Sequence, residues 1–358
     1  MRISLYSFLF INVIFSLSLH AQANERKTLS ESFAIGTNGQ LLIKNKYGYI
    51  ECNVWNKDSV RIETEIVVNT RKNEDAEDLI NSIRVDYNKF VDLVEVETIF
   101  GDNRKSFLKT YLSKIDPFDN NKVDVNYSVW MPASIKLEIE NKFGDVLIEN
   151  MTGDLDIQIN YGDLRLDDHL GSARLDLKFG RLVGNTITNL KGDFKNYDLK
   201  LKRVDELNIQ STGSEINIDE VKFARIDLSR DELEIEKIEI IKGKASLSDI
   251  EIITVSEEVD LFLKNSTFET EEFADDIKRV EIREESSQID LNIRNLNIGL
   301  NAELENAQLS VPKTVENVSR DVLDEKKEHR KVSLEYGSSA KKIPFVLHGV
   351  KGRITLID

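Results

Sequence analysis

One short phrase recurs through the middle of this 358-residue chain and constrains the fold more than any other feature. Between about Leu137 and Val311 its clear copies read FGDVLIE, YGDLRLD, FGRLVGN and YDLKLKR, and its weaker copies GSEINID, RDELEIE, LSDIEII, NSTFETE, SSQIDLN and NAQLSVP. The polar residue before the first apolar one marks each copy: Asp145, Asp163, Arg181, Asp198, Glu215, Glu232, Asp249, Thr267, Gln288 and Gln308. These markers are 18, 18, 17, 17, 17, 17, 18, 21 and 20 residues apart. A near-constant period of this size is typical of a solenoid.

Each copy alternates apolar and polar residues after its marker, as Leu164 and Leu166 do around Arg165. Period two predicts short strands with one buried face, and one unit can bury its apolar row only by stacking on the next at about 4.8 Å. We therefore predict an all-β chain, a right-handed parallel β-helix or β-solenoid with coils of about 17–18 residues, preceded by an N-terminal β-region. The hand follows the usual chirality of parallel crossovers. An antiparallel sandwich is the alternative, and the repetition of the phrase itself favours the solenoid.

The N-terminus has the pattern of a secretory signal peptide. Arg2 precedes an apolar run from Leu5 to Leu19, and Ala21 and Ala23 flank Gln22, which predicts cleavage after Ala23. No later stretch approaches 18 apolar residues, so the mature chain is not expected to span a membrane. Export carries the chain across the first membrane and leaves two locations open, the periplasm and the cell surface or outer membrane.

The rest of the chain divides into three predicted segments. Residues 24–132 form an N-terminal β-rich region, 133–316 the repeat array and 317–358 a C-terminal capping segment. Within them we expect a helix over 73–82, strands over 60–68, 83–87, 91–99 and 123–131, an irregular excursion over 101–121, an insertion or capping helix over 317–331, and closing strands over 332–334, 344–347 and 352–357. The phrase at 41–51 resembles the one at 141, with Gly48 and Gly144 96 residues apart, so the same unit opens both halves.

Charge and cysteine content exclude several functions. The whole chain carries a net charge of −16, and removal of the signal peptide with Arg2 makes it −17. This balance argues against nucleic acid and against anionic membrane surfaces as partners. Solubility of a charged solenoid surface explains the acidity best, with Ca²⁺ or a basic partner as alternatives. Cys52 is the sole cysteine, so an internal disulfide or a cysteine metal cluster is excluded, and a buried thiol is expected.

Aromatic residues precede the glycine in the first copies: Phe143-Gly144, Tyr161-Gly162 and Phe179-Gly180. Glycine there indicates a corner that needs a positive φ, and the aromatic rings would stack as a ladder. Corner packing is the favoured interpretation, and a platform for stacking sugars is the alternative.

Catalytic motifs of the common hydrolase, metalloprotease, P-loop and dinucleotide-binding types are absent from the sequence. Parallel β-helices include polysaccharide lyases and hydrolases, and the densest polar cluster here is Asp167-Asp168-His169 near Arg165. A loop between coils explains that cluster better, and His169, His329 and His348 are expected at the surface or in turns. We assign no catalytic, cofactor-binding or metal-ligating residue.

The marker carboxylates would stack at roughly 5 Å, where like charges repel. Lys142, Arg181, Lys195 and Lys200 could offset the carboxylates of Asp145, Asp163, Asp198, Glu215, Glu232 and Asp249. Calcium would need several oxygens around each ion, and the calcium nonapeptide Gly-Gly-x-Gly-x-Asp is absent. We therefore interpret the column as part of a surface that binds an uncharged ligand or a protein.

Three phrases together resemble a known bacterial family: NKYG…WNKDSV at 45–60, VWMP at 129–132 and NKFGDV at 141. It is the exported "putative adhesin" β-helix family, a domain of unknown function related to head-GIN adhesin-like domains. The closing GVKGRITLID is also similar to the ends of such proteins, and the resemblance covers roughly 30–358. It implies a right-handed parallel β-helix in the bacterial envelope and supplies no catalytic residues.

The function that these features favour is a non-enzymatic, exported, adhesin-like or scaffold β-solenoid that binds an envelope or surface protein or a glycan. A polysaccharide-active β-helix enzyme is the first alternative. A periplasmic signalling or stress-linked binding protein is the second.

Overall fold

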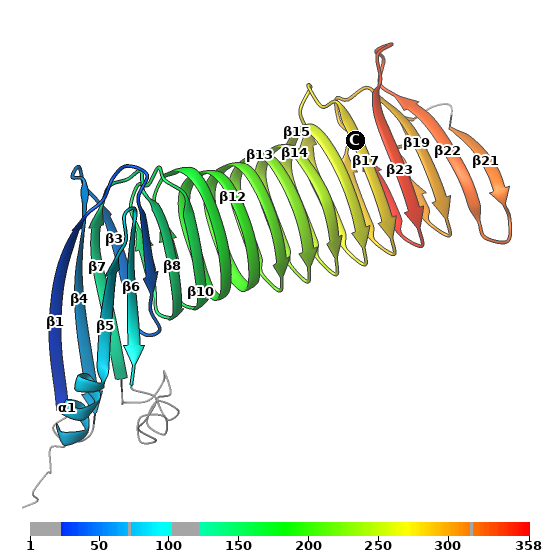
Figure 1. Cartoon of the computed structure of the whole chain (residues 1–358). Helices are drawn as coiled ribbons and strands as arrows, with labels where there is room; N and C mark the ends of the chain where they lie inside the picture. The colour runs from blue at the N-terminus through cyan, green and yellow to red at the C-terminus, as the bar shows by residue number, and fades with distance from the viewer. Residues whose placement is uncertain (1–22, 71–72, 102–121, 316–317) are drawn as a thin grey trace, which may run out of the picture.

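A computed structural model describes residues 23–70, 73–101, 122–315 and 318–358. These residues are all-β apart from one helix, and their strands form an elongated stack (Figure 1). The signal-peptide segment and most of the excursion expected over 101–121 lie outside the described residues.

The described part of the N-terminal region is a β-rich cap with one helix. Its elements are β1 (Ala23–Ala34), β2 (Gln40–Lys44), β3 (Ile50–Val54), β4 (Ser59–Thr70), α1 (Asn73–Ser82), β5 (Ile83–Lys89), β6 (Leu93–Phe100) and β7 (Lys122–Met131). The helix covers the predicted residues. β4 runs antiparallel to both β1 and β7, and β5 runs antiparallel to β6, so antiparallel strands close this end of the stack.

The repeats form parallel strands that stack coil on coil. They are β8 (Lys136–Phe143), β9 (Val146–Ile148), β10 (Leu155–Tyr161), β11 (Leu164–Leu166), β12 (His169–Thr212), β13 (Glu215–Ser229), β14 (Glu232–Ser246), β15 (Asp249–Lys264), β16 (Thr267–Phe273), β17 (Arg279–Glu285), β18 (Gln288–Asn292), β19 (Ile298–Glu305) and β20 (Gln308–Ser310). Marker lies opposite marker: Asp198 pairs with Glu215, Glu232 with Asp249, and Thr267 with Gln288. The sequence period is therefore the strand register, and parallel pairing excludes an antiparallel sandwich for these repeats.

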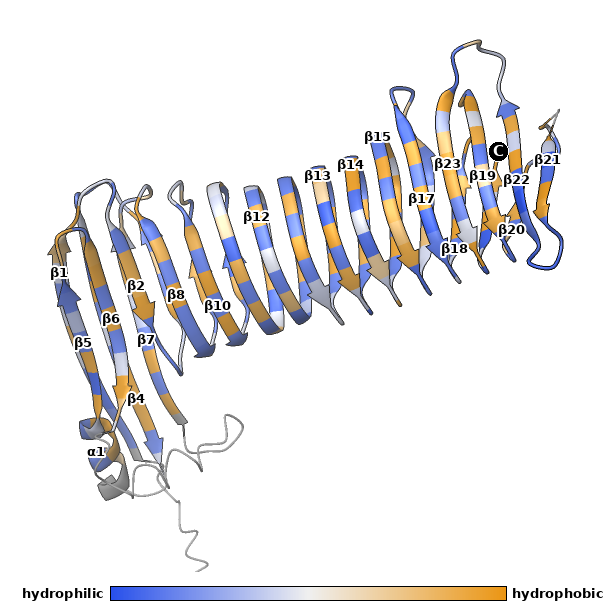
Figure 2. Cartoon of the chain, turned by 45° about the vertical axis from the view of Figure 1, so that its right-hand side comes forward, coloured by the Kyte–Doolittle hydropathy of each residue, from blue (hydrophilic) through white to orange (hydrophobic). Residues whose placement is uncertain are grey.

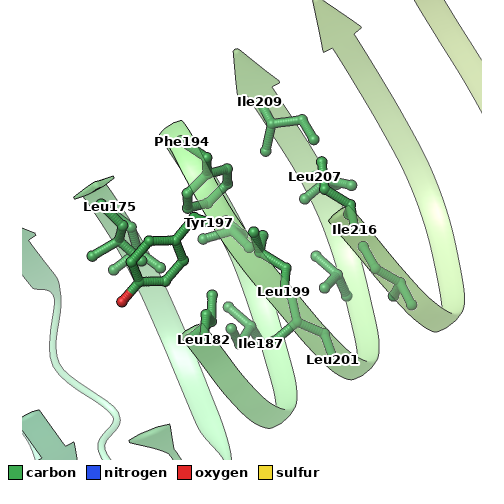
Figure 3. Close-up of a cluster of buried hydrophobic side chains, with 14 of the residues drawn as sticks. Leu175, Leu182, Ile187, Phe194, Tyr197, Leu199, Leu201, Leu207, Ile209 and Ile216 are labelled. Atoms are coloured by element: carbon green, nitrogen blue, oxygen red, sulfur yellow. The ribbon is translucent and has the colours of Figure 1, made fainter. Parts of the chain in front are cut away.

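The interior is a continuous apolar core. Side chains alternate between buried and outward positions along each strand, which Figure 2 shows as alternating hydrophobic and hydrophilic bands. Leucine and isoleucine from successive coils lie above one another, with Phe194 and Tyr197 filling the space between them (Figure 3). Each fully buried side chain of this size contributes roughly 1.5–3 kcal/mol, so the stacking of coils, rather than any single coil, holds the fold.

The spatial order of the coils differs from their sequence order at the N-terminal end. β2 lies between β6 and β8, and β3 lies between β7 and β9, all in parallel. The phrase at 41–51 is thus the coil directly next to the one at 141. The sequence predicts the same unit at both places but not that the two copies are neighbours. A Cβ on Gly144 would lie 2.1 Å from the carbonyl oxygen of Gly48, and a Cβ on Gly48 would lie 2.5 Å from the carbonyl oxygen of Val125, which is why both corners need glycine.

The C-terminal end has the same interleaving. β23 (Ile343–Val350) lies between β17 and β19, and β24 (Arg353–Ile357) lies between β18 and β20. Gln308 therefore does not follow Gln288 in the stack, because Arg353 pairs with both. The last step between markers, the 20 residues from Gln288 to Gln308, therefore connects two coils that are separated in space by the coil of β23 and β24.

The helix expected over 317–331 is wrong. The described part of that segment forms β21 (Ser319–Asp324) and the start of β22 (His329–Tyr336), an antiparallel pair that continues onto β19. Its dense charge suits an outer strand as well as a helix, because five of the six residues of β21 are exposed, the adjacent Val322 and Leu323 among them. The predicted closing strands are confirmed as β22, β23 and β24.

Candidate functional site

The aromatic residues at the first corners stack as predicted. The ring centroids of Tyr47 and Phe143 are 5.4 Å apart, those of Phe143 and Tyr161 5.2 Å, and those of Tyr161 and Phe179 5.0 Å. The planes are within 14° of parallel in every pair. Each contact of this kind is worth about 0.5–1.5 kcal/mol beyond area burial, so the aromatic ladder fastens four consecutive coils at one corner.

The geometry of the aromatic ladder favours packing over sugar stacking. A sugar stacks on the face of an aromatic ring, and here the faces of Phe143 and Tyr161 are covered by neighbouring rings. Tyr161 remains 48% exposed although a ring covers each of its faces, so its edge is what solvent meets. Phe179 ends the ladder, with one face stacked on Tyr161. The ammonium nitrogen of Lys46 lies over the ring of Tyr47, 4.7 Å from its centroid.

The cluster Asp167-Asp168-His169 serves the turns between coils. The backbone N–H of Thr186 donates to Asp168 Oδ1 at 3.1 Å, and the N–H of Asp168 itself donates to Asn150 Oδ1 at 3.2 Å. The expected surface or turn position of His169 is wrong: the residue begins β12 and is buried, with Nδ1 3.1 Å from the carbonyl oxygen of Met151. Burial lowers the pKa of His169. These contacts give the cluster a structural role and explain its density in the sequence.

The marker column is satisfied at its N-terminal end by backbone donors and one arginine. The N–H of Asp163 donates to Asp145 Oδ1 and the N–H of Arg181 donates to Asp163 Oδ1, each at 2.9 Å. Arg181 Nε donates to Asp198 Oδ2 at 2.8 Å, and this hydrogen bond is the main reason that the pKa of Arg181 is raised. Arg181 thus offsets the column as predicted. Among the residues that the structure describes, Lys142, Lys195 and Lys200 form no ion pair.

Further along, the outward face of β13, β14, β15, β16 and β18 carries what we call the acidic strip. It consists of seven carboxylates in two adjacent columns: Glu215, Glu232 and Asp249 in the first, and Glu234, Glu251, Glu269 and Asp290 in the second. Thr267, Gln288 and Asn217 complete the columns. No described lysine or arginine forms an ion pair with any of the seven.

The other outward run of the same coils is charged in a different way. Here Lys244 pairs with Asp227 at 3.1 Å, Lys242 with Glu258 at 2.8 Å, and Lys264 with Glu285 at 3.0 Å. We call this the paired face. Surface ion pairs contribute little to stability, but the contrast matters, because one face of the stack is neutralised internally and the other is left with uncompensated negative charge.

A buried polar spine, which sequence reasoning missed, runs behind the corners. The residue before the marker is Ser214, Asp231, Ser248, Ser266 or Ser287 in five successive coils, and all five are buried. Each side-chain oxygen accepts the N–H of the equivalent residue one coil earlier, at 2.7 Å for Ser214 to Asp231 and 3.1 Å for the three pairs that follow. The run of serines directly before the marker was the sequence signal for it.

The spine ends on a buried carboxylate, Glu284. Its Oε2 accepts the N–H of Ser287 at 3.0 Å, and its carboxyl group occupies the space that a Cβ on Gly352 would need. Burial raises the pKa of Glu284, and the N–H groups of Ser287, Gly352 and Val350 oppose that shift. Glu284 therefore joins its own coil to the interleaved C-terminal coil.

Stability should fall as the pH rises through the raised pKa of Glu284. Its folded pKa lies above its usual 4.5, so the folded state binds more protons than the unfolded state between those two values. The contribution is complete below pH 4.5 and lost as the pH rises through the folded pKa. The Glu284→Gln variant should lack this component in urea denaturation between pH 4 and 8. An identical pH slope in wild type and variant would contradict it.

The remaining candidates occupy structural positions. His329 Nε2 lies 2.8 Å from Glu303 Oε1, across the pairing of β22 with β19. His348 lies on the exposed face of β23. Cys52 is buried, as predicted, and burial raises the pKa of its thiol.

The described residues contain neither a candidate metal-ion cluster nor a candidate membrane-spanning helix. No group of three or more His, Cys, Asp or Glu in this part of the chain is placed to hold a metal ion. Within the same residues, no helix has the length and apolar character needed to cross a membrane.

Comparisons with known proteins concern structure alone, since no family model and no curated protein matches the chain. A "putative adhesin" from Parabacteroides distasonis is 9% identical with a TM-score of 0.31, and the match covers 74% of this chain and 92% of that one. A "putative lipid binding protein" from the same species is 10% identical with a TM-score of 0.32, over 73% and 93%. A "putative cell adhesion protein" from Clostridium sporogenes is 10% identical with a TM-score of 0.19, over 92% and 99%. Proteins described as adhesins therefore stand among the structures that this chain resembles, at low sequence identity.

Proposed function

We propose that this chain is a non-enzymatic, exported, adhesin-like or scaffold module of the bacterial envelope that binds a protein through the acidic strip. The frame is a right-handed parallel β-solenoid over 133–316, between an N-terminal β-rich region over 24–132 and a C-terminal capping segment over 317–358. The signal pattern ending at Ala23 supports export. The usual hand of parallel crossovers supports the right-handed form.

The observation that carries the proposal is the uncompensated charge of the acidic strip. Two carboxylates about 5 Å apart in water repel by roughly 0.8 kcal/mol, so seven in register cost stability unless something neutralises them. The paired face shows that this chain can place lysine beside such carboxylates, as Lys244 does for Asp227. A strip left unpaired across β13, β14, β15, β16 and β18 suits a partner that supplies the positive charge, such as a protein with a basic surface.

A photo-crosslinking experiment tests the proposal on intact and lysed cells. A photoreactive residue replaces Asn217 on the acidic strip or, as a control, Asn208 on the opposite run. We expect a discrete crosslinked protein from position 217 and none from position 208. The variant Glu232→Gln/Glu234→Gln/Asp249→Asn/Glu251→Gln should reduce its yield at least about tenfold, because charge complementarity is removed.

The matched control neutralises the same number of carboxylates on the paired face, with Asp227→Asn/Glu258→Gln/Asp260→Asn/Glu285→Gln. Its crosslinking yield at position 217 should stay within about twofold of wild type. Equal yields from both positions, or equal losses in both variants, would sink the assignment to the strip. Protease treatment of intact cells, with a lysed control, separates surface exposure from the periplasm.

A further inference from the structure

A hollow of about 560 Å³ lies at the corner of the last coils, away from the aromatic ladder and next to the C-terminal end of the acidic strip. It is lined by Asn265, Ser286, Asn306 and Gln308, with Lys351 and Arg353 among them, and by neighbouring serine, threonine, glutamine and glycine. We call it the corner hollow. Its lining carries amides, hydroxyls and two cations, and no carboxylate.

Interleaving of the C-terminal coil places both cations in the middle of the corner hollow. Lys351 lies in the turn between β23 and β24, and Arg353 begins β24, opposite Gln288 on one side and Gln308 on the other. Backbone hydrogen bonds to the coils on either side hold Lys351 and Arg353 in place. The N–H of Lys351 donates to Glu305 at 2.9 Å, and the N–H of Arg353 donates to Ser287 at 2.9 Å.

The corner conformation turns the lining side chains outward. Asn265, Ser286, Lys351 and Asn306 all have positive φ, between 48° and 60°, and all four are exposed. Asparagine tolerates this left-handed conformation better than most residues. The side chains therefore project from one edge, with the hydroxyl of Ser286 on one side of Lys351 and the amide of Asn306 on the other.

The charge of the corner hollow differs from that of the rest of the molecule. The chain carries −16 overall, yet no described acidic group forms an ion pair with Lys351 or Arg353. The first column of the acidic strip changes from carboxylates to Thr267 and Gln288 at the same coils. An anion that enters here meets two free cations and neutral hydrogen-bonding groups.

We propose that the corner hollow binds an acidic saccharide, with the sugar carboxylate at Lys351 and Arg353 and its hydroxyl groups at the surrounding amides. Guanidinium and ammonium groups bind carboxylates through charge-assisted hydrogen bonds. Asparagine, glutamine and serine can both donate to and accept from sugar hydroxyls. This site adjoins the end of the proposed protein-binding strip at Thr267 and Gln288, but its two cations are not part of that strip and the proposal does not depend on it.

Isothermal titration calorimetry with three oligosaccharides of equal length tests the proposal: oligogalacturonate, a sulfated heparin fragment and neutral maltohexaose. Oligogalacturonate should bind the mature chain, and Lys351→Gln/Arg353→Gln should weaken that binding at least about tenfold. The control Lys326→Gln/Lys327→Gln removes two exposed cations from the β21–β22 turn and should change binding less than twofold.

A second variant tests the amides without disturbing the corner. Asn306→Gly keeps the left-handed conformation, which glycine adopts freely, and deletes only the side chain. It should weaken binding of oligogalacturonate severalfold while its circular dichroism and melting temperature match wild type. Failure of oligogalacturonate to bind, equal binding of maltohexaose, stronger binding of the heparin fragment, or equal loss in the Lys326/Lys327 control would each overturn the proposal.

Discussion

Deletion of residues 343–358 should detach β19, β20, β21 and β22 from the stack while the coils before them stay folded. The deletion removes β23 and β24, the strands that lie between β17–β18 and β19–β20. It also removes the buried side chains of Phe345, Leu347, Ile354 and Leu356. At roughly 1.5–3 kcal/mol each, these four contribute on the order of 6–12 kcal/mol to this end of the molecule.

Hydrogen exchange read by mass spectrometry checks this expectation. Amides of β19 and β22 should exchange as in an unfolded chain, and those of β8 to β16 should keep their protection. A synthetic peptide spanning 339–358, added in trans, should restore protection by filling the same position. Full protection of β19 in the deletion variant without the peptide would contradict this expectation, because it would mean that β19 packs directly against β17.

How much of this architecture could be predicted depends on what a repeat encodes. Marker spacing fixes which residues are equivalent, so the pairing of Asp198 with Glu215 and of Glu232 with Asp249 follows from the sequence. It does not fix which coil lies beside which, because every coil offers the same apolar row to a neighbour. The phrase Gly352-Arg353-Ile354 has the pattern of the early copies, and reading it as another coil would have placed β24 in the stack.

The candidate sites differ in the same way: some follow from equivalent positions in the repeat, and others depend on which coils are neighbours. Stacking of Phe143, Tyr161 and Phe179 was predictable, because equivalent positions in successive coils must lie above one another. The acidic strip and the paired face look alike in sequence, since both alternate charge with apolar residues. Which carboxylate meets a lysine depends on neighbours one coil away. The corner hollow depends on the interleaved position of Lys351 and Arg353, which no local pattern reveals.

Asp231 is the member of the buried spine whose loss should cost most. It is 3% exposed, and its carboxyl group accepts three hydrogen bonds: Ser211 Oγ at 2.9 Å, the N–H of Ser214 at 2.7 Å and the N–H of Ser229 at 2.6 Å. Burial raises the pKa of Asp231, and these donors oppose the shift. The carboxyl group therefore tolerates burial because its oxygens are matched by donors.

Replacement of Asp231 by alanine should lower the free energy of unfolding by about 3–5 kcal/mol, since it leaves the three donors buried without a partner. Urea denaturation measures the loss. Asp231→Ser should recover roughly half of it, because serine fills this position in the neighbouring coils and accepts the equivalent N–H, as Ser248 does. Asp219→Ala, an exposed change two residues before Val221, should stay within about 0.5 kcal/mol of wild type. If the alanine variant were as stable as the Asp219 control, the spine would be a consequence of the stacking and not one of its causes.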